Sequence, residues 1–164
     1  MPSMASPISH SDQPVQDCQR YLAQVTEEIA GNFHPTTPVW PLLSARSNAV
    51  DNVLTHLWQF YLDQRSDLAL AAVGGYGRGE LYPFSDIDLL ILVTHSPDQE
   101  TAAQISELLR NLWDIGLKVG SSVRTLDECE TLAREDLTIF TSLLEARCIA
   151  GSAELFSQLK GHID

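Results

Sequence analysis

The sequence predicts an α+β protein in which a small mixed β-sheet is packed against helices and carries further flanking helices. Two short apolar runs, at residues 68–73 and 86–93, are bounded by glycines or turn residues, as buried strands usually are. Longer segments on both sides of these runs repeat apolar residues at helical spacing. A third apolar segment, at residues 117–126, follows a predicted helix, and this order favours a mixed sheet.

The sequence predicts an N-terminal arm at residues 1–44, which carries one helix. Residues 1–13 are polar and rich in proline and serine, which is typical of a disordered segment. Apolar residues at helical spacing then predict a helix over residues 15–30. Gly31 and Asn32 are expected to end this helix.

A second helix opens the main domain, which we assign to residues 45–164. The spacing predicts this helix over residues 45–64. One apolar stripe is expected to pack on the sheet, made of Val50, Val53, Leu54, Leu57, Phe60 and Tyr61. A chain of 164 residues, 44% of them hydrophobic, is long enough for one sizeable core and short for two.

Two strands joined by a tight glycine turn form the predicted centre of the domain, at residues 68–73 and 86–93. Successive side chains on a strand point to opposite faces. Asp86 and Asp88 are therefore expected on the same face of the second strand, while Ile87 points into the core. Two carboxylates would then share one edge of a site.

The remaining elements are predicted in the order helix, strand and helices. Ser96 as an N-cap and Pro97 at the first helical position predict a helix that Gly116 ends. The third strand is predicted within residues 117–126. The rest of the chain is predicted to be helical, at residues 126–134, 137–150 (closed by Gly151) and 153–162.

The charge balance argues against a nucleic acid as the default partner. The chain has 10 Lys and Arg residues against 22 Asp and Glu residues, which gives a formal net charge of −12. Affinity for a phosphate backbone comes from clustered Lys and Arg. A protein or a small molecule is therefore the expected acceptor.

The N-terminus and the cysteines predict a cytoplasmic protein with no membrane partner. The first residues lack the basic and apolar regions of a secretory signal, and no apolar run approaches the roughly 20 residues of a membrane span. Cys18, Cys129 and Cys148 are odd in number and form no CxxC pair. They fit small buried side chains better than a disulfide framework or a zinc site.

The glycine-rich segment before the two aspartates fails three familiar motifs. The dinucleotide fingerprint GxGxxG fails because Glu80 stands three positions after Gly77, and the P-loop fails because Gly79 is followed by Glu80. An EF-hand fails because the Asp86 to Asp88 pair continues into an apolar strand.

The order of a glycine-rich turn and two carboxylates nevertheless indicates phosphate chemistry. Mg²⁺ binds proteins through one or two carboxylates plus substrate phosphates. Glycines allow backbone N–H groups to approach those phosphates closely. The sequence therefore predicts a metal-assisted reaction of a nucleoside triphosphate, with Asp86 and Asp88 as ligands of Mg²⁺ or Mn²⁺.

Residues 72–81, Pro83 and residues 85–92 resemble the signature of the DNA polymerase β-like nucleotidyltransferase superfamily. The same string closely resembles the N-terminal catalytic domain of the bacterial PII uridylyltransferase/uridylyl-removing enzyme family. The resemblance continues through Leu112-Trp113-Asp114, Val119-Gly120, Ser122-Val123-Arg124-Thr125-Leu126 and Leu144-Glu145-Ala146-Arg147. It runs from about residue 54 to the C-terminus, and it implies a polymerase β-like nucleotidyltransferase fold for residues 45–164.

The resemblance implies transfer of UMP from UTP to a tyrosine of the nitrogen-regulatory PII protein, with release of pyrophosphate. Asp86 and Asp88 would be the catalytic metal ligands. Arg78 would stabilise the charge of pyrophosphate, and Ser85 would donate to a phosphate or cap the turn. The remaining nucleotide-binding residues would be Gly74 and Gly75, through their N–H groups, and Gly77 and Gly79, which keep the turn open.

Several alternatives stay open in the sequence. Arg78 could instead form a surface salt bridge with Glu80, and a structural pairing role for Arg124 and Arg147 is at least as probable as nucleotide contact. Superfamily members often supply a third carboxylate from a neighbouring strand, but residues 117–124 contain no acid. The remaining candidates for that third ligand are Asp127, Glu145 and Glu80, or water.

The resemblance also leads to expectations about the length of the whole protein and about alternative functions. Full-length members of the family continue with a metal-dependent HD hydrolase domain and ACT domains, whereas no His-Asp dipeptide occurs here. We therefore expect a fragment of a longer multidomain protein. Alternative functions are another protein nucleotidyltransferase, such as an adenylyltransferase, or a nucleotide-binding regulatory module without catalysis.

Overall fold

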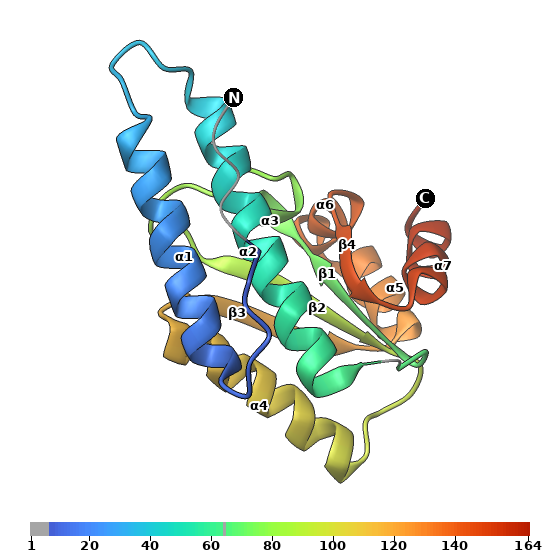
Figure 1. The fold of residues 1–164 in the computed structure, drawn as a ribbon. Helices are drawn as coiled ribbons and strands as arrows, with labels where there is room; N and C mark the ends of the chain where they lie inside the picture. Colours follow the sequence, from blue (N-terminus) through green and yellow to red (C-terminus); the bar gives the residue numbers. More distant parts are fainter. Residues whose placement is uncertain (1–6, 64) are drawn as a thin grey trace.

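The structure is a computed structural model that describes residues 7–63 and 65–164. A four-stranded mixed sheet lies between two layers of helices, which confirms the predicted α+β fold (Figure 1). The strand order is β3-β2-β1-β4; β1 is antiparallel to β2 and β4, whereas β2 and β3 are parallel. The strands are β1 (Leu68–Ala72), β2 (Ile87–Val93), β3 (Val119–Arg124) and β4 (Arg147–Gly151).

One face of the sheet is covered by three long helices, α1 (Pro14–Gly31), α2 (Val39–Leu62) and α4 (Gln99–Ile115) (Figure 1). Their apolar side chains form the larger core with alternate residues of the strands. The strand residues of this core include Leu68, Leu70, Ile87, Leu89 and Ile91, all almost fully buried.

The other face is covered by three shorter helices, α5 (Leu126–Glu135), α6 (Leu137–Leu144) and α7 (Ala153–Ile163) (Figure 1). The intervening strand residues point to this side and form the second core. Its members include Ala69, Ala71, Leu90, Leu92, Cys129, Leu143 and Leu155. The sheet therefore separates two cores, and the two central strands, β1 and β2, contribute to both.

The predicted N-terminal helices are present, with one boundary wrong. The helix at residues 15–30 is confirmed as α1, whereas α2 begins at Val39, six positions before the predicted 45. Pro41 lies in the first turn of α2, where a missing N–H leaves no hydrogen bond unmade. Phe60 does not belong to the buried stripe, because its side chain is 53% exposed. The predicted disorder of residues 1–13 falls partly on residues 1–6, outside the described residues.

The helix α4 is confirmed, but its N-cap was assigned to the wrong residue. The side chain of Asp98, and not Ser96, accepts a hydrogen bond from the N–H of Thr101 at 2.8 Å. Pro97 accordingly lies before the helix. Gly116 ends α4 as predicted, in the left-handed conformation with φ of +102°.

The prediction of one helix over residues 137–150 is wrong. The helix α6 ends at Leu144, and residues 147–151 form β4, which pairs with the free edge of β1. The ammonium group of Lys160 donates to the carbonyl oxygens of Leu143 and Leu144, at 3.1 and 2.7 Å, and so satisfies the end of α6. A long-range strand pairing of this kind overrides local helical spacing.

The connection between β1 and β2 is longer than the predicted tight turn. It contains a one-turn helix, α3 (Gly74–Gly77), followed by a loop that leads into β2. We call residues 73–80 the glycine turn. It lies at the C-terminal end of β1, beside the start of β2.

The three cysteines differ in burial. Cys18 and Cys129 are fully buried, one in each core, whereas Cys148 on β4 is half-buried.

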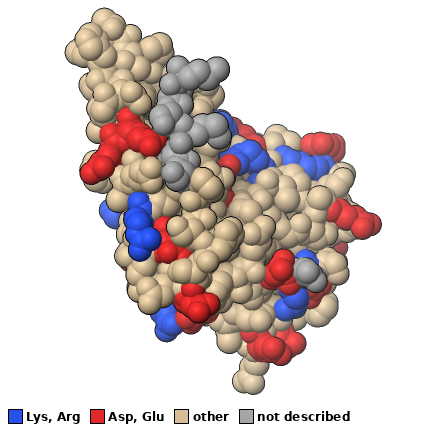
Figure 2. All heavy atoms as spheres, viewed as in Figure 1, with Lys and Arg blue, Asp and Glu red and all other residues tan. Residues whose placement is uncertain are grey.

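On the face drawn in Figure 2, the described Lys and Arg side chains are interspersed with Asp and Glu and form no continuous basic surface. No helix within residues 7–63 and 65–164 combines the length and the apolarity needed to cross a membrane.

A capping box at the start of α5 gives a first prediction about stability. The Thr125 hydroxyl accepts from the N–H of Glu128, and the Glu128 carboxylate accepts from the N–H of Thr125. We expect Thr125→Ala to lower the free energy of unfolding by about 1 kcal/mol, measured by urea unfolding. Thr131→Ala, at an exposed position of the same helix, is the control, and equal destabilisation of the two variants would contradict the cap.

Candidate active site

Asp88 lies at the second position of β2, on the face of the sheet that the shorter helices cover. Its neighbours in the strand, Ile87 and Leu89, are buried in the larger core, as the predicted alternation requires. Asp88 itself is exposed and lines a cavity. Asp86 comes immediately before β2 and is also exposed.

The Asp88 carboxylate fits between two glycines. A methyl group at Gly74, whose φ is +61°, would lie 3.4 Å from Oδ2 of Asp88, in ordinary contact. A methyl group at Gly120 on β3 would lie only 3.0 Å from Oδ1. Gly120 is also the residue that pairs with Asp88 across the two parallel strands. The glycine turn and β3 therefore enclose this carboxylate from both sides.

The electrostatics around Asp88 are unfavourable for its own charge. Partial burial, and secondly the negative charge of Asp86, raise the pKa of Asp88 above its ordinary value. No Lys, Arg or His within the described ranges forms an ion pair with either carboxylate. The pair is therefore a concentration of negative charge without a compensating cation from the described protein.

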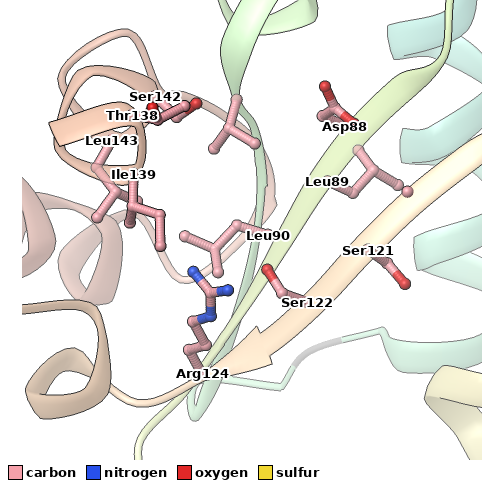
Figure 3. A pocket seen from close by; sticks show the side chains of 12 residues that line it. Asp88, Leu89, Leu90, Ser121, Ser122, Arg124, Thr138, Ile139, Ser142 and Leu143 are labelled. Carbon is pink, nitrogen blue, oxygen red and sulfur yellow. The ribbon is translucent and has the colours of Figure 1, made fainter. Parts of the chain in front are cut away.

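A cavity of about 300 Å³ opens beside Asp88, between the start of the β2–β3 pair and α6. Figure 3 shows Asp88 at one end of this cavity and the guanidinium group of Arg124 at the other. The wall from α6 carries the hydroxyls of Thr138 and Ser142, together with apolar side chains. The cavity thus combines one acidic side chain, one cationic side chain and several hydroxyls.

The glycine turn leaves some of its backbone donors without acceptors. The N–H of Gly77 donates to the carbonyl oxygen of Val73, and that of Gly79 to Tyr76, at 3.1 and 3.0 Å. The N–H groups of Gly74 and Gly75 have no acceptor among the described residues. Gly74 lies next to Asp88, so a phosphate bound there could accept from its N–H.

Gly77 has a structural role that requires its lack of a side chain. A methyl group there would lie 2.6 Å from the carbonyl oxygen of Glu145 and 3.0 Å from that of Ala72. The glycine turn is therefore packed directly against the end of α6 and the end of β1. Gly79, with φ of +76°, adopts the left-handed conformation that reverses the chain after α3.

Arg78 points to carboxylates in this structure. Its guanidinium group forms ion pairs with Glu145 at 2.6 Å and with Glu80 at 3.3 Å. These contacts raise the pKa of Arg78 above its ordinary value, with the Glu145 hydrogen bond as the largest cause. The alternative that the sequence left open, a pair with Glu80, is therefore present, and contact with pyrophosphate stays a prediction.

A hydrogen-bonded network that the sequence did not reveal holds the glycine turn in place. The Arg147 guanidinium donates to Oδ2 of Asp51 at 2.5 Å and to the carbonyl oxygens of Tyr76 and Gly77, at 3.0 and 3.4 Å. The Tyr76 hydroxyl donates to Oδ1 of Asp51 at 2.5 Å. The pairing role of Arg147 is thus observed. No sequence signal links these residues, because they lie on α2, α3 and β4.

Ser85 lies in the loop that leads into β2 and is half-buried. Its N–H donates to the carbonyl oxygen of Tyr82 at 3.1 Å, which closes a turn. Between them, Phe84 has a positive φ of 67° and is 91% exposed. The Ser85 hydroxyl makes no hydrogen bond within the described residues, so its predicted contact with a phosphate remains a prediction.

No third carboxylate among the described residues completes the Asp86 and Asp88 pair. Across residues 7–63 and 65–164, no cluster of three or more His, Cys, Asp or Glu side chains could hold a metal ion. Of the predicted candidates, Glu80 and Glu145 are paired with Arg78, and Asp127 lies in the first turn of α5. On β3, the position opposite Asp88 is Gly120.

The two carboxylates still fit a magnesium ion. Mg²⁺ usually keeps several waters and is held by one or two carboxylates plus substrate phosphates. The raised pKa of Asp88 and the absence of an ion-paired partner among the described residues are what a cation-binding pair shows before the cation is added.

Comparison with known families decides the class of this site. The family model described as Nucleotidyltransferase domain matches residues 54–140, a stretch that contains the glycine turn, both aspartates and β3. The chain belongs to the nucleotidyltransferase domain family. The predicted nucleotidyltransferase fold is therefore confirmed, and the match supports a transferase.

This nucleotidyltransferase domain is similar to curated enzymes of one more specific kind. It is 43% identical over 150 residues to the bifunctional uridylyltransferase/uridylyl-removing enzyme of Photobacterium profundum, covering 91% of this chain and 17% of that protein. The enzyme of the same name from Pseudomonas fluorescens is 46% identical over 143 residues, covering 87% and 16%. That of Vibrio cholerae is 41% identical over 158 residues, covering 94% and 18%. The chain thus spans less than a fifth of the length of these relatives.

Proposed function

We propose that this nucleotidyltransferase domain transfers UMP from UTP to a tyrosine hydroxyl of a PII signalling protein and releases pyrophosphate. The observation that carries the proposal is the Asp88 carboxylate between Gly74 and Gly120, beside a cavity and next to the Gly74 N–H, which has no acceptor among the described residues. The choice of uridylyl transfer rests on the similarity to the uridylyltransferase/uridylyl-removing enzymes.

The residues have distinct roles in this proposal. Asp86 and Asp88 hold Mg²⁺ or Mn²⁺, which when bound neutralises charge on the phosphates. The N–H groups of Gly74 and Gly75 donate to phosphate oxygens, and Ser85 adds a hydroxyl donor. Gly77 and Gly79 maintain the shape of the turn that presents these donors. Arg78 supplies positive charge to pyrophosphate when it exchanges its carboxylate partners for the product.

The reaction is an in-line displacement at the α-phosphorus. The tyrosine oxygen forms a bond to this phosphorus, the bond to the bridging oxygen breaks, and pyrophosphate leaves with the electron pair. The phenolic proton passes to solvent, since no described carboxylate stands ready as a third member of the site. A phenol, with a pKa near 10, loses its proton more readily than an aliphatic alcohol.

The proposal also covers the compartment and the longer protein in which the domain acts. We propose that the domain acts in the cytoplasm as part of a longer protein, with the catalytic domain at residues 45–164 preceded by an arm. The coverage of less than a fifth of each relative supports the longer protein. Nucleic acid and membrane partners are not part of the proposed function.

Labelled nucleotides test the proposal directly. The purified chain is incubated with Mg²⁺, PII protein and UTP labelled at the α-phosphorus, and we expect label on PII with release of unlabelled pyrophosphate. A PII variant with phenylalanine at the acceptor tyrosine is the control and should remain unlabelled. Label transferred equally well from ATP would indicate an adenylyltransferase instead.

A second candidate function is a nucleotide-binding module without catalysis. The glycine at position 120, where a third carboxylate would face Asp88, favours this candidate. It would be supported if UTP bound in the presence of Mg²⁺ while no pyrophosphate appeared with any PII acceptor. Measurable pyrophosphate release coupled to PII labelling would remove it.

A further inference from the structure

The exposed aromatic side chains gather at the end of the sheet that carries the candidate active site. Six are exposed in the described part of the chain, namely Phe33, Trp40, Phe60, Tyr82, Phe84 and Trp113. All except Phe60 belong to segments near the point where β1 ends and β2 begins. Single exposed apolar residues need no explanation, but a group of them on one part of the surface marks a binding site.

The topology places these segments together. A short connection joins the end of α2 to the start of β1, so the start of α2, which carries Trp40, lies where β1 ends (Figure 1). The connection between α1 and α2, with Phe33, lies at the same end. Trp113 is in the last turn of α4, which leads into β3, and β3 begins beside the start of β2.

The α1–α2 connection and its flanks carry no charge. Asp, Glu, Lys and Arg make up 20% of the chain, but none of them occurs at residues 29–45. In Figure 2 the described atoms at the tip of these two helices include no acidic or basic side chain on the drawn face. Aromatic side chains with few charges are typical of the centre of a protein–protein interface.

Phe84 is the most exposed of these aromatic side chains, and its backbone is strained. Residues 82–85 form a β-turn, closed by the hydrogen bond from the N–H of Ser85 to the carbonyl oxygen of Tyr82 at 3.1 Å. Pro83 at the second position and a φ of +67° at Phe84 are features of a type II turn, whose third position favours glycine or asparagine. Within residues 7–63 and 65–164, no other residue except glycine has a positive φ.

The fold itself does not explain a phenylalanine at this position. The side chain is 91% exposed, so its ring contributes little to packing, while the positive φ costs free energy. Glycine would form the same turn without strain. A strained and exposed aromatic residue therefore indicates a role in contact with another molecule.

The position of Phe84 favours a protein over a nucleotide as that molecule. Phe84 is not among the residues that line the cavity beside Asp88, so a nucleotide bound there does not require it. Phe84 precedes Asp86 by two residues, which span at most about 7 Å. A protein whose tyrosine reacts beside the two aspartates has to cover the surface around them, and the turn is part of that surface.

We propose that the turn at residues 82–85 is a docking point for the acceptor protein, with the Phe84 ring as its anchor. The inference rests on the proposed function in one respect, namely that the acceptor is a protein that presents a tyrosine. The ring stands on an exposed turn, so the matching surface of the acceptor is an apolar hollow. Buried aromatic anchors of this kind carry much of the binding energy of an interface.

Separate measurements of acceptor binding and nucleotide binding test this role. Dissociation constants are measured by calorimetry for PII without nucleotide and for UTP with Mg²⁺, using the unchanged chain, Phe84→Gly and Phe84→Ala. We expect both variants to weaken PII binding about tenfold, the effect of losing one anchor side chain. Binding of UTP should change less than about twofold. In the labelling assay, KM for PII should rise about tenfold while kcat changes less than about twofold.

Two further variants and the thermal stability separate docking from a structural role. Phe84→Tyr retains the ring and should retain the affinity for PII. Phe60→Ala removes an exposed aromatic side chain near the other end of α2 and should leave both constants unchanged. Phe84→Gly should raise the midpoint of thermal unfolding by about 2–4 °C, because glycine adopts the positive φ without strain. A structural role of Phe84 would lower this midpoint instead.

The outcomes distinguish the docking point from the proposed function. Unchanged affinity for PII in both Phe84 variants would overturn the docking point, and so would weaker binding of UTP alone, which would assign Phe84 to the nucleotide. Failure of the unchanged chain to bind PII would also overturn it, as would a dimer, seen by light scattering, that Phe84→Gly dissociates. If binding of PII depends on Phe84 while no label reaches PII from UTP, the docking point stands and the proposed transfer fails.

Discussion

Asp88→Asn should abolish nucleotidyl transfer while the fold remains intact. The substitution removes the charge of a proposed metal ligand at almost constant volume. Metal-ion catalysis contributes several kcal/mol to transition-state stabilisation, so we expect the transfer rate to fall by at least about 100-fold. The measurement is the initial rate of PII labelling from UTP. Asp86→Asn should have the same effect, because Asp86 lies beside Asp88 in the same acidic pair.

The stability of the Asp88→Asn variant provides an independent check. The folded protein raises the pKa of Asp88, so at pH values above that pKa the ionised carboxylate favours the unfolded state. The destabilisation is absent at low pH and develops as pH rises through the unfolded and then the folded pKa. Asparagine removes it, and urea unfolding at pH 7 should give an unchanged or higher free energy of unfolding.

The matched control for this prediction is Asp114→Asn on α4. Asp114 is exposed, and its side chain forms no ion pair among the described residues. Both the transfer rate and the stability should be unchanged in this variant. Retention of full transfer in Asp88→Asn would remove the metal assignment, whereas its loss together with unfolding would mean that Asp88 is structural.

Arg147→Ala should be strongly destabilising, because it breaks the network that holds the glycine turn. The substitution leaves the Asp51 carboxylate, 24% exposed, without its cation and removes the donors to Tyr76 and Gly77. It also removes a cation–π contact, since Cζ of Arg147 lies 5.3 Å from the centre of the Tyr76 ring. With a discount for partial exposure, we expect the free energy of unfolding to fall by about 2 kcal/mol.

Transfer should also fall in Arg147→Ala at temperatures where the variant is folded, because the glycine turn loses the contacts that fix its position. Burial and the nearby charge of Asp51 raise the pKa of Tyr76 above its ordinary value, so Tyr76 stays a neutral donor to Asp51 in the variant. The control is Arg110→Ala, which breaks an exposed pair with Glu107 and should cost less than about 0.5 kcal/mol. Equal unfolding midpoints for the two variants would contradict the role of the network.

The part of the fold that could be predicted from the sequence is the part that local rules determine. Alternation along residues 86–93 predicts which side chains enter the core, and Ile87 and Asp88 lie as expected. Helical spacing and the glycine at position 116 predict α4 and its end. The acidic pair beside a glycine turn could likewise be recognised in the sequence, because both features lie within one short stretch of chain.

The parts that could not be predicted depend on contacts between distant residues. Residues 147–150 were predicted as the end of a helix because their apolar pattern is short, and only the open edge of β1 makes residues 147–151 a strand. The pairing of Arg147 with Asp51 joins residues far apart in the chain. The sequence likewise left the pairing of Arg78 open, because its pair with Glu145 depends on which carboxylates the fold brings near.

The glycine at position 120 has a consequence for how substitutions there are to be interpreted. The nearest atom to an added methyl group would be Oδ1 of Asp88, at 3.0 Å, so even alanine would have to displace the carboxylate slightly. A larger residue would move it further and narrow the entrance to the cavity. Impaired turnover in a mutant of this residue would then report a shifted neighbour, although Gly120 itself has no side chain with which to contact either substrate.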